Sequence, residues 1–334
     1  PFGYGLSYTD FEIKPGSFSL VDGAFALEVS VTNIGNLPGK EVAQCYVTLP
    51  CGKLGTPAKV LVAFGKTGLL NPGESEELLL TFSYETFASY DDVNYAWLLQ
   101  QGAYSILLGD AEVSSFYLEE DLILSRHESA LAPVTPFDRL VNQEGKPVYL
   151  PVPTRIPQEE PVPAELPRLP KDGMTLDDVK AGKITVEELV ARLSDEDLIH
   201  MVRAEGMSSP KVTPGTAAAF VGVTPSLKAM GLPTLCCTDG PSGIRMVSED
   251  KCVCYPAATC LAATWNTELV REMYELCGSE LASYHVDILL GPGTNIHRDP
   301  LCGRNFEYFS EDPLLAGKIS AAVCNGLDDA GVSG

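Results

Sequence analysis

Two segments of the chain hold most of the side chains that could do chemistry. In the first, Thr238–Arg245, Asp239 follows a short apolar run and precedes a Gly-Pro pair. A carboxylate at the end of a buried strand, on a loop tightened by glycine and proline, could accept paired hydrogen bonds from sugar hydroxyls. The alternative is that Asp239 only forms a turn or caps a helix, as aspartate often does.

The second segment is Asn295–Pro313, which is polar, aromatic and charged. Arg304 could donate a fork of hydrogen bonds to hydroxyl groups or to a carboxylate. Glu307, Glu311 and Asp312 could act as acids or bases. However, Glu311 and Asp312 stand immediately before a proline, which is typical of a helix start, where acidic side chains suit the helix dipole.

Other kinds of chemistry find little support. The sequence contains no P-loop, no G-x-S-x-G elbow and no H-E-x-x-H motif. Its ten cysteines are spread over 334 residues without a C-x-x-C pair, and its four histidines are scattered. We therefore expect buried, reduced thiols rather than a disulfide framework or a zinc site. We interpret His297 as a packed loop residue rather than a catalyst.

The charge of the chain narrows the range of partners. Lysine and arginine number 23 against 45 aspartate and glutamate, a formal net charge of −22. Because such a chain is repelled by phosphate groups, we expect neither nucleic acid nor an anionic membrane as a partner. No signal peptide is visible and no apolar stretch reaches the ~18 residues of a membrane helix. We expect a cytoplasmic protein; secretion is the alternative, because the chain begins at Pro1 without an initiator methionine.

The elements that would position these side chains fall into three zones, of which residues 1–126 are the first. Apolar and polar residues alternate there, with glycine, proline and asparagine between the runs. This pattern predicts an all-β sandwich of the immunoglobulin or fibronectin type III class. The predicted strands are residues 25–32, 42–49, 77–82, 102–109 and 115–118.

Residues 127–170 are predicted to be a connector. From Pro151 to Pro170, seven of twenty positions are proline, which excludes helix and central strand and favours extended geometry. The connector is either a free linker or an arm laid along a neighbouring surface.

The third zone, residues 171–334, has an α/β pattern. A capping box at Thr185 and a second helix start at Ser194 are followed by strands at 235–238 and 286–290 that lead into glycine-rich loops. The zone is too short for a whole (β/α)8 TIM-like barrel, which needs ~250 residues, so we predict the first part of one. A helix is predicted at 267–285, with one apolar stripe formed by Leu269, Val270, Met273, Leu276, Cys277, Leu281 and Tyr284.

Several of these motifs resemble a known family. Thr238–Arg245, the sequence Tyr255-Pro-Ala-Ala-Thr and the long run Gly291–Pro313 are similar to the first domain of glycoside hydrolase family 3, and of its bacterial β-glucosidases in particular. Pro1–Thr9, and Trp97 before Gly102-Ala-Tyr, resemble the fibronectin-III-like domain of that family. The usual order is barrel, α/β sandwich, fibronectin-like domain. Here the fibronectin-like domain comes first, as in rearranged members from gut and rumen bacteria.

The resemblance implies a retaining β-glucosidase that forms a covalent glycosyl-enzyme, with two carboxylates ~5–5.5 Å apart and no metal or organic cofactor. The family's nucleophile is an aspartate before a tryptophan, late in the barrel, and its acid/base glutamate lies in the α/β sandwich. Neither Trp97 nor Trp265 follows an aspartate, so we expect no catalytic residue in this chain. By resemblance, Asp239 binds the outer hydroxyls of glucose, Arg304 assists, and Arg245 lies close by or behind.

The sequence is compatible with three functions. The first is a β-glucosidase fragment that needs a sandwich domain and the rest of the barrel to act on a β-glucoside or oligosaccharide. A β-xylosidase is an alternative within that class. The second is a module that merely binds sugar or a partner. The third, an extracellular adhesion protein, is disfavoured because the barrel motifs are highly specific.

Overall fold

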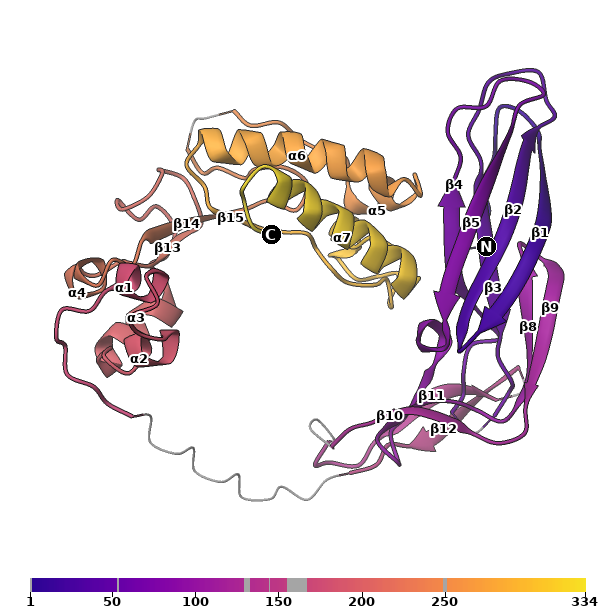
Figure 1. The fold of residues 1–334 in the computed structure, drawn as a ribbon, viewed down its shortest axis with the longest axis horizontal. Helices are drawn as coiled ribbons and strands as arrows, with labels where there is room; N and C mark the ends of the chain where they lie inside the picture. Colours follow the sequence, from indigo (N-terminus) through magenta and orange to yellow (C-terminus); the bar gives the residue numbers. More distant parts are fainter. Residues whose placement is uncertain (1, 53, 129–132, 144, 155–166, 249–250) are drawn as a thin grey trace. The chain divides into compact units, whose positions relative to one another are not determined.

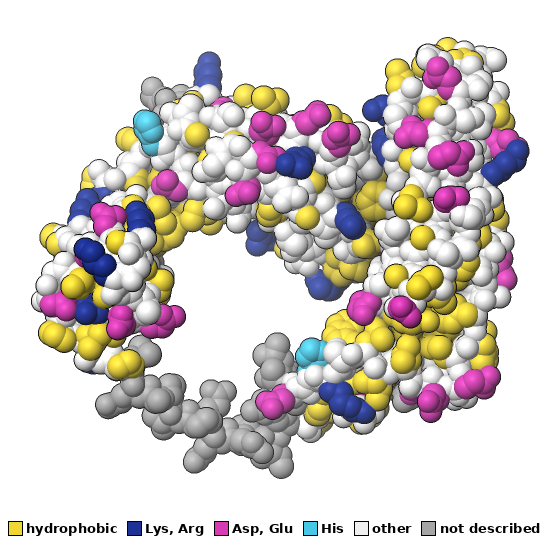
Figure 2. Space-filling view, viewed as in Figure 1, with side chains coloured by type: hydrophobic (Ala, Val, Ile, Leu, Met, Phe, Trp, Pro, Cys, Tyr) yellow, Lys and Arg dark blue, Asp and Glu magenta, His cyan; other side chains and the backbone are white. Residues whose placement is uncertain are grey.

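The computed structural model describes residues 2–52, 54–128, 133–143, 145–154, 167–248 and 251–334 (Figure 1). The chain divides into two compact units, residues 1–160 and 161–334. Acidic side chains are spread over the visible face of both units (Figure 2). Across these ranges, every helix is too short or too polar to cross a membrane.

In the first unit, two antiparallel sheets pack face to face and enclose one hydrophobic core between them. The first sheet has the order β1-β2-β5 and the second has the order β4-β3-β8-β9. Alternate residues of β2, such as Leu27 and Val29, are completely buried, because successive side chains of a strand point to opposite faces. They share the core with Cys45 and Ile106 of the second sheet. The bounds are β1 (Phe11–Val21), β2 (Ala24–Asn33), β3 (Val42–Thr48), β4 (Lys59–Lys66), β5 (Ser75–Ser83), β8 (Gly102–Leu108) and β9 (Ala111–Leu118).

All five strands predicted from the alternation of residues 1–126 are confirmed: they correspond to β2, β3, β5, β8 and β9. The 3-10 turn η1 (Tyr84–Phe87) leads into a small third sheet with the order β10-β7-β6. This sheet consists of β6 (Ser89–Asp91), β7 (Ala96–Leu99) and β10 (Leu122–Arg126).

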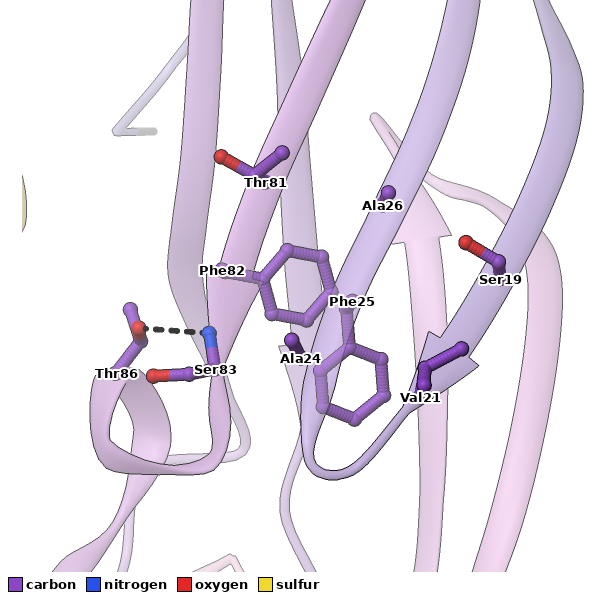
Figure 3. A pocket seen from close by; sticks show the side chains of 9 residues that line it. All are labelled: Ser19, Val21, Ala24, Phe25, Ala26, Thr81, Phe82, Ser83 and Thr86. Atoms are coloured by element: carbon purple, nitrogen blue, oxygen red, sulfur yellow. Dashed lines mark hydrogen bonds between the residues drawn. The ribbon is translucent and has the colours of Figure 1, made fainter.

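A shallow hollow of about 430 Å³ lies over β1, β2 and β5 (Figure 3). The rings of Phe25 and Phe82 stack beneath it, with centroids 4.6 Å apart. Thr86 accepts a hydrogen bond from the backbone nitrogen of Ser83 beside it, at 3.3 Å. None of the residues that line the hollow can ionise, so we assign no chemistry to it.

A hairpin of β11 (Asp138–Gln143) and β12 (Lys146–Pro151) lies inside the predicted connector, and the sequence did not predict it. It packs on the first unit: a Cβ atom at Gly55 would lie 2.6 Å from that of Val141, and Arg139 pairs with Asp92 at 3.1 Å. The hairpin precedes the proline-dense stretch and shares only Pro151 with it. The prediction of a connector is therefore wrong over residues 138–151, which the proline density from Pro151 onward does not describe.

The sheet of the second unit has the order β13-β14-β15, from β13 (Ala218–Val221), β14 (Thr234–Asp239) and β15 (Ile288–Leu290). The strands predicted at 235–238 and 286–290 are confirmed as β14 and β15, which are parallel. β13 was not predicted, and it runs antiparallel to β14, which departs from a βα repeat. After the helix α7 (Pro313–Asp329), the chain returns to β15, where the backbone nitrogen of Leu289 donates to the carbonyl oxygen of Ser333 at 2.9 Å.

Both predicted capping residues begin helices. Thr185 accepts a hydrogen bond from the nitrogen of Glu188 at 3.2 Å, and Ser194 accepts one from the nitrogen of Asp197 at 3.2 Å. Such bonds satisfy amide groups that the first helical turn leaves open. The helices are α1 (Leu176–Lys180), α2 (Val186–Val190), α3 (Asp195–Arg203), α4 (Pro225–Ala229), α5 (Ala258–Ala262), α6 (Thr267–Ser283) and α7 (Pro313–Asp329).

The apolar stripe predicted for α6 is partly wrong. Leu269 and Leu276 are 47% and 68% exposed, whereas Tyr274, which the prediction left out, is completely buried. The buried face is a narrow strip directed at α7: a Cβ atom at Gly326 of α7 would lie 3.0 Å from that of Tyr274. The apolar residues outside this strip therefore remain in contact with water. The fully buried positions are Val270, Tyr274, Cys277 and Leu281.

The end of the connector lies against the second unit. The nitrogen of Leu169 donates to the carbonyl oxygen of Ala191 at 2.9 Å, and Arg168 donates to that of Leu193 at 2.9 Å. Lys171 pairs at 2.6 Å with Asp197, whose residue is only 3% exposed. These contacts favour the arm interpretation for residues 168–171. Residues 155–166, the middle of the proline-rich stretch, lie outside the described residues.

The docking of this arm predicts a pH-dependent stability. Burial alone would raise the pKa of Asp197, but hydrogen bonds from Lys171, Ser194 and Ser226 outweigh it and lower the pKa to about 2. Since the folded-state pKa lies below the ordinary value of 3.8, ionised Asp197 stabilises the fold above about pH 4 and loses that effect as the pH falls toward 2.

We expect Asp197→Asn to lower the free energy of unfolding at pH 7 by roughly 1–3 kcal/mol. The deficit should shrink as the pH falls below about 4. Urea unfolding followed by Trp265 fluorescence in a Trp97→Phe background measures this. Asp177→Asn, an exposed carboxylate on α1, is the matched control. A deficit independent of pH would contradict the ion-pair explanation.

Candidate functional site

The first part of the candidate site is the turn that follows β14. The backbone nitrogen of Arg245 donates to the carbonyl oxygen of Asp239 at 2.8 Å, and the side chain Nη1 of Arg245 lies 3.2 Å from Oδ2 of Asp239. The two side chains are 75% and 45% exposed. An ion pair this exposed contributes little to stability, so carboxylate and guanidinium remain available to a ligand.

Glycine is required for this turn. The φ angle of Gly240 is +138°, a conformation that residues with a side chain rarely adopt, and a Cβ atom there would lie 1.8 Å from the carbonyl oxygen of Gly243. The close approach directs the chain from Asp239 back to Arg245, so that the two charged residues face each other.

The turn is also held from behind by α6. Tyr274 is completely buried, and its hydroxyl donates to the carbonyl oxygen of Pro241 at 2.7 Å. Its ring stacks on that of Tyr255, with centroids 5.9 Å apart. Burial raises the pKa of Tyr274 and raises the pKa of Tyr255 to about 12. Because the Tyr274 hydroxyl therefore stays protonated, it remains a hydrogen-bond donor to the loop.

The loop after β15 lies against the loop after β14. Asp239 and Leu290 are neighbours in the parallel register. One step further, a Cβ atom at Gly291 would lie 3.2 Å from Cα of Pro241. A Cβ atom at Gly293 would lie 2.3 Å from the carbonyl oxygen of Glu307, so this loop also touches the 3-10 turn η2 (Asn305–Glu307). The two segments singled out in the sequence thus share one edge of the sheet.

Arg304 precedes η2 and is 70% exposed. Its Nε donates to Oε1 of Glu307, whose side chain is 8% exposed, and its guanidinium carbon lies 5.9 Å from the ring centroid of Tyr308. The hydrogen bond and charge of Glu307 raise the pKa of Arg304. Among the contacts that the structure describes, Arg304 pairs with Glu307 and not with Asp239 or Arg245.

The remaining candidates of this segment are structural. Asp312 is the N-cap of α7, where its Oδ1 accepts a hydrogen bond from the nitrogen of Leu315 at 2.8 Å, and burial raises its pKa. Glu311 is exposed in front of it. The prediction of a helix start at these residues is confirmed.

His297 fixes the backbone of η2. Its Nε2 lies 2.9 Å from the carbonyl oxygens of both Asn305 and Tyr308. Because carbonyl oxygens only accept, Nε2 must carry the proton. Thr259 of α5 donates to the same two oxygens, at 3.1 and 3.0 Å. The interpretation of His297 as a packed loop residue is confirmed. Thr259 was missed because its partners are backbone atoms distant in sequence.

Among the residues that the structure describes, no three His, Cys, Asp or Glu side chains lie close enough together to bind one metal ion. None of the ten cysteines, all of which lie among the described residues, is joined in a disulfide. Burial raises the pKa of Cys45 to about 12 and that of Cys277 to about 11. The prediction of buried thiols is wrong for four of the ten, because Cys51, Cys254, Cys260 and Cys302 are exposed.

Comparisons with known proteins bear on both units. Residues 41–112 match the family model of the fibronectin type III-like domain, and residues 184–334 match that of the glycosyl hydrolase family 3 N-terminal domain. A β-glucosidase of Ruminococcus albus is 44% identical over 349 residues, which cover 100% of this chain and 37% of that protein. β-Glucosidase A of Butyrivibrio fibrisolvens is 34% identical, over 98% of this chain and 45% of its own length.

A solved structure of a β-glucosidase from Paenibacillus barengoltzii aligns with the whole chain, with a TM-score of 0.92 and 44% identity, and the match covers 39% of that protein. Residues 184–334 carry the N-terminal domain of glycosyl hydrolase family 3, and the fold of the whole chain is that of the aligned part of this β-glucosidase. The chain spans less than half the length of these relatives.

The contact between α6 and the Asp239 turn predicts a measurable effect of Tyr274. We expect Tyr274→Phe to lower the free energy of unfolding by roughly 1–3 kcal/mol, because the carbonyl group of Pro241 loses its buried donor. Hydrogen exchange in residues 239–246 should accelerate. Tyr117→Phe, an exposed tyrosine of β9, is the control. Unchanged exchange in that segment would show that Tyr274 does not fix the turn.

Proposed function

We propose that this chain is part of a β-glucosidase, which removes terminal β-D-glucosyl residues with retention of configuration. The observation that carries the proposal is the exposed Asp239–Arg245 pair at the carboxyl end of a parallel strand. Active sites of α/β barrels lie at that end of the strands. The relatives named β-glucosidase support the same assignment.

In this proposal the chain binds the glucosyl ring. Ionised Asp239 accepts hydrogen bonds from two outer hydroxyls of glucose, each worth roughly 1.5–3 kcal/mol because the acceptor is charged. Arg245, paired with Asp239 at 3.2 Å, holds that carboxylate in orientation. Arg304 donates to a further hydroxyl from the neighbouring loop. Binding that tightens as the ring distorts toward an oxocarbenium-like state accelerates the reaction.

The reacting carboxylates are not among these residues. By resemblance to the family, the nucleophile and the acid/base belong to parts of the complete protein that this chain does not contain. There they would stand ~5–5.5 Å apart, as retention requires. Substrate, sandwich domain and the remainder of the barrel are therefore the partners that we propose.

We also propose that residues 171–334 are the first part of a (β/α)8 barrel. The parallel pair β14–β15 and the return of the chain after α7 to the edge of β15 support this. The antiparallel β13 is a departure from the regular barrel pattern. We further propose a reducing, cytoplasmic compartment, which is supported by cysteines that form no disulfide although four of them are exposed.

The first test concerns the chain by itself. Purified residues 1–334, incubated with an aryl β-glucoside, should show no turnover above background, because the carboxylate pair that performs the double displacement is absent. The complete protein should hydrolyse the same substrate and release β-glucose first, which NMR detects. Saturable hydrolysis by the 334-residue chain would overturn the interpretation that the catalytic carboxylates lie outside it, and would direct attention to Glu307, Glu311 and Asp312.

The second test concerns Asp239 in the complete protein. Asp239→Asn keeps the shape of the side chain and removes its charge, so we expect kcat/KM for a β-glucoside to fall at least ~100-fold, or about 2.7 kcal/mol. The loss should appear in kcat as well as KM. Circular dichroism should be unchanged, because an exposed turn residue contributes little to the core. Kinetics within about threefold of the parent would remove Asp239 from the site.

A further inference from the structure

Glu307 differs from every other carboxylate near the candidate site. Its side chain is 8% exposed, whereas that of Asp239 is 45% exposed. A buried carboxylate is costly unless a partner compensates its charge. The partner that the structure gives it is Nε of Arg304, three residues earlier and 70% exposed. Glu307 is thus too enclosed to receive a substrate directly, while the residue it holds is open to one.

The backbone under Glu307 is fixed independently of that pair. The carbonyl oxygens of Asn305 and Tyr308, on either side of it, each accept hydrogen bonds from His297 and Thr259 at 2.9–3.1 Å. Gly293 packs against the carbonyl oxygen of Glu307 itself. The carboxylate therefore occupies a defined position at the base of the loop that follows β15.

The geometry of Arg304 shows what such a fixed carboxylate can do. Glu307 engages Nε, one edge of the guanidinium, and Tyr308 lies 5.9 Å from its central carbon. The terminal Nη groups remain as donors. A flexible arginine loses rotamer entropy when it binds a ligand, and it loses less when it is already held in place.

We propose that Glu307 is a positioning residue: it holds the Arg304 side chain in the orientation in which its free Nη donors meet a substrate hydroxyl. The proposal rests on the proposed function, because it specifies how one of the sugar-binding residues is prepared for its ligand. Glu307 has no part in proton transfer or nucleophilic attack in this proposal.

The test is a double-mutant cycle in the complete protein, with Glu307→Gln, Arg304→Lys and both together. We expect Glu307→Gln to reduce kcat/KM for an aryl β-glucoside at least tenfold, chiefly by raising KM. Arg304→Lys lacks the Nε donor that Glu307 holds. In that background, therefore, adding Glu307→Gln should change kcat/KM by less than threefold. Glu307→Asp, which keeps the charge, should recover part of the loss. Glu268→Gln, an exposed carboxylate in the first turn of α6, is the control and should leave the kinetics unchanged.

Other results of this experiment would contradict either the positioning role of Glu307 or the proposed function. If Glu307→Gln costs the same factor with and without Arg304→Lys, Glu307 does not act through Arg304. If kcat falls and KM is unchanged, with loss of the basic or acidic limb of the pH profile, Glu307 takes part in the chemistry and the positioning role is wrong. A parent protein without β-glucosidase activity would overturn the proposed function instead. In that case the Tm values of the parent, the two single variants and the double variant still test the pair. If the two single changes in Tm add up to that of the double variant, Glu307 and Arg304 are not coupled.

Discussion

The parallel pairing of β14 with β15 is the constraint on which the candidate site depends. Only three residue pairs define it, from Cys237 with Ile288 to Asp239 with Leu290. Asp287 secures the start of the pairing: its backbone nitrogen donates to the carbonyl oxygen of Cys236 at 2.9 Å, and its carboxylate accepts from the nitrogen of Cys236 at 2.7 Å. Because both strands end at the same edge, the loops that leave them meet there.

The packing of α6 on α7 fixes the position of the Asp239 turn at that edge of the sheet. α6 lies on α7, where Gly326 and Gly278 permit close approach of the two backbones. Arg271 and Asp329 join the two helices through hydrogen bonds of 2.6 and 2.8 Å. Tyr274, in the middle of the buried strip of α6, both fills this contact and reaches the Asp239 turn with its hydroxyl. One side chain thus connects the hydrophobic core with a residue of the proposed sugar site.

Burial separates the acidic residues of the site by role. Asp239 is exposed and paired with an exposed arginine, which suits a group that exchanges water for a ligand. Glu307 is buried and supports Arg304, and Asp312 is half-buried and caps α7. The same residue type therefore binds, positions or caps according to its access to solvent, since a buried carboxylate requires fixed partners whereas an exposed one can take new ones.

Elements whose causes are local could be predicted from the sequence. Alternation defined the strands of the sandwich, the hydroxyl groups of Thr185 and Ser194 defined helix starts, and the glycine-rich ends of β14 and β15 indicated where a site would lie. The motifs there also identified the family. These features depend on neighbours along the chain, which the sequence displays directly.

Features that depend on residues distant in sequence follow from the tertiary structure alone. There β13 pairs antiparallel with β14, and β11 and β12 form a hairpin ahead of the proline-dense stretch. Tyr274 rather than Leu276 lies in the buried strip of α6, because a helix buries only the face that its partner covers. Arg304 pairs with Glu307, and His297 holds two backbone carbonyl oxygens. Periodicity shows which residues share a face, but it does not show which neighbour covers that face.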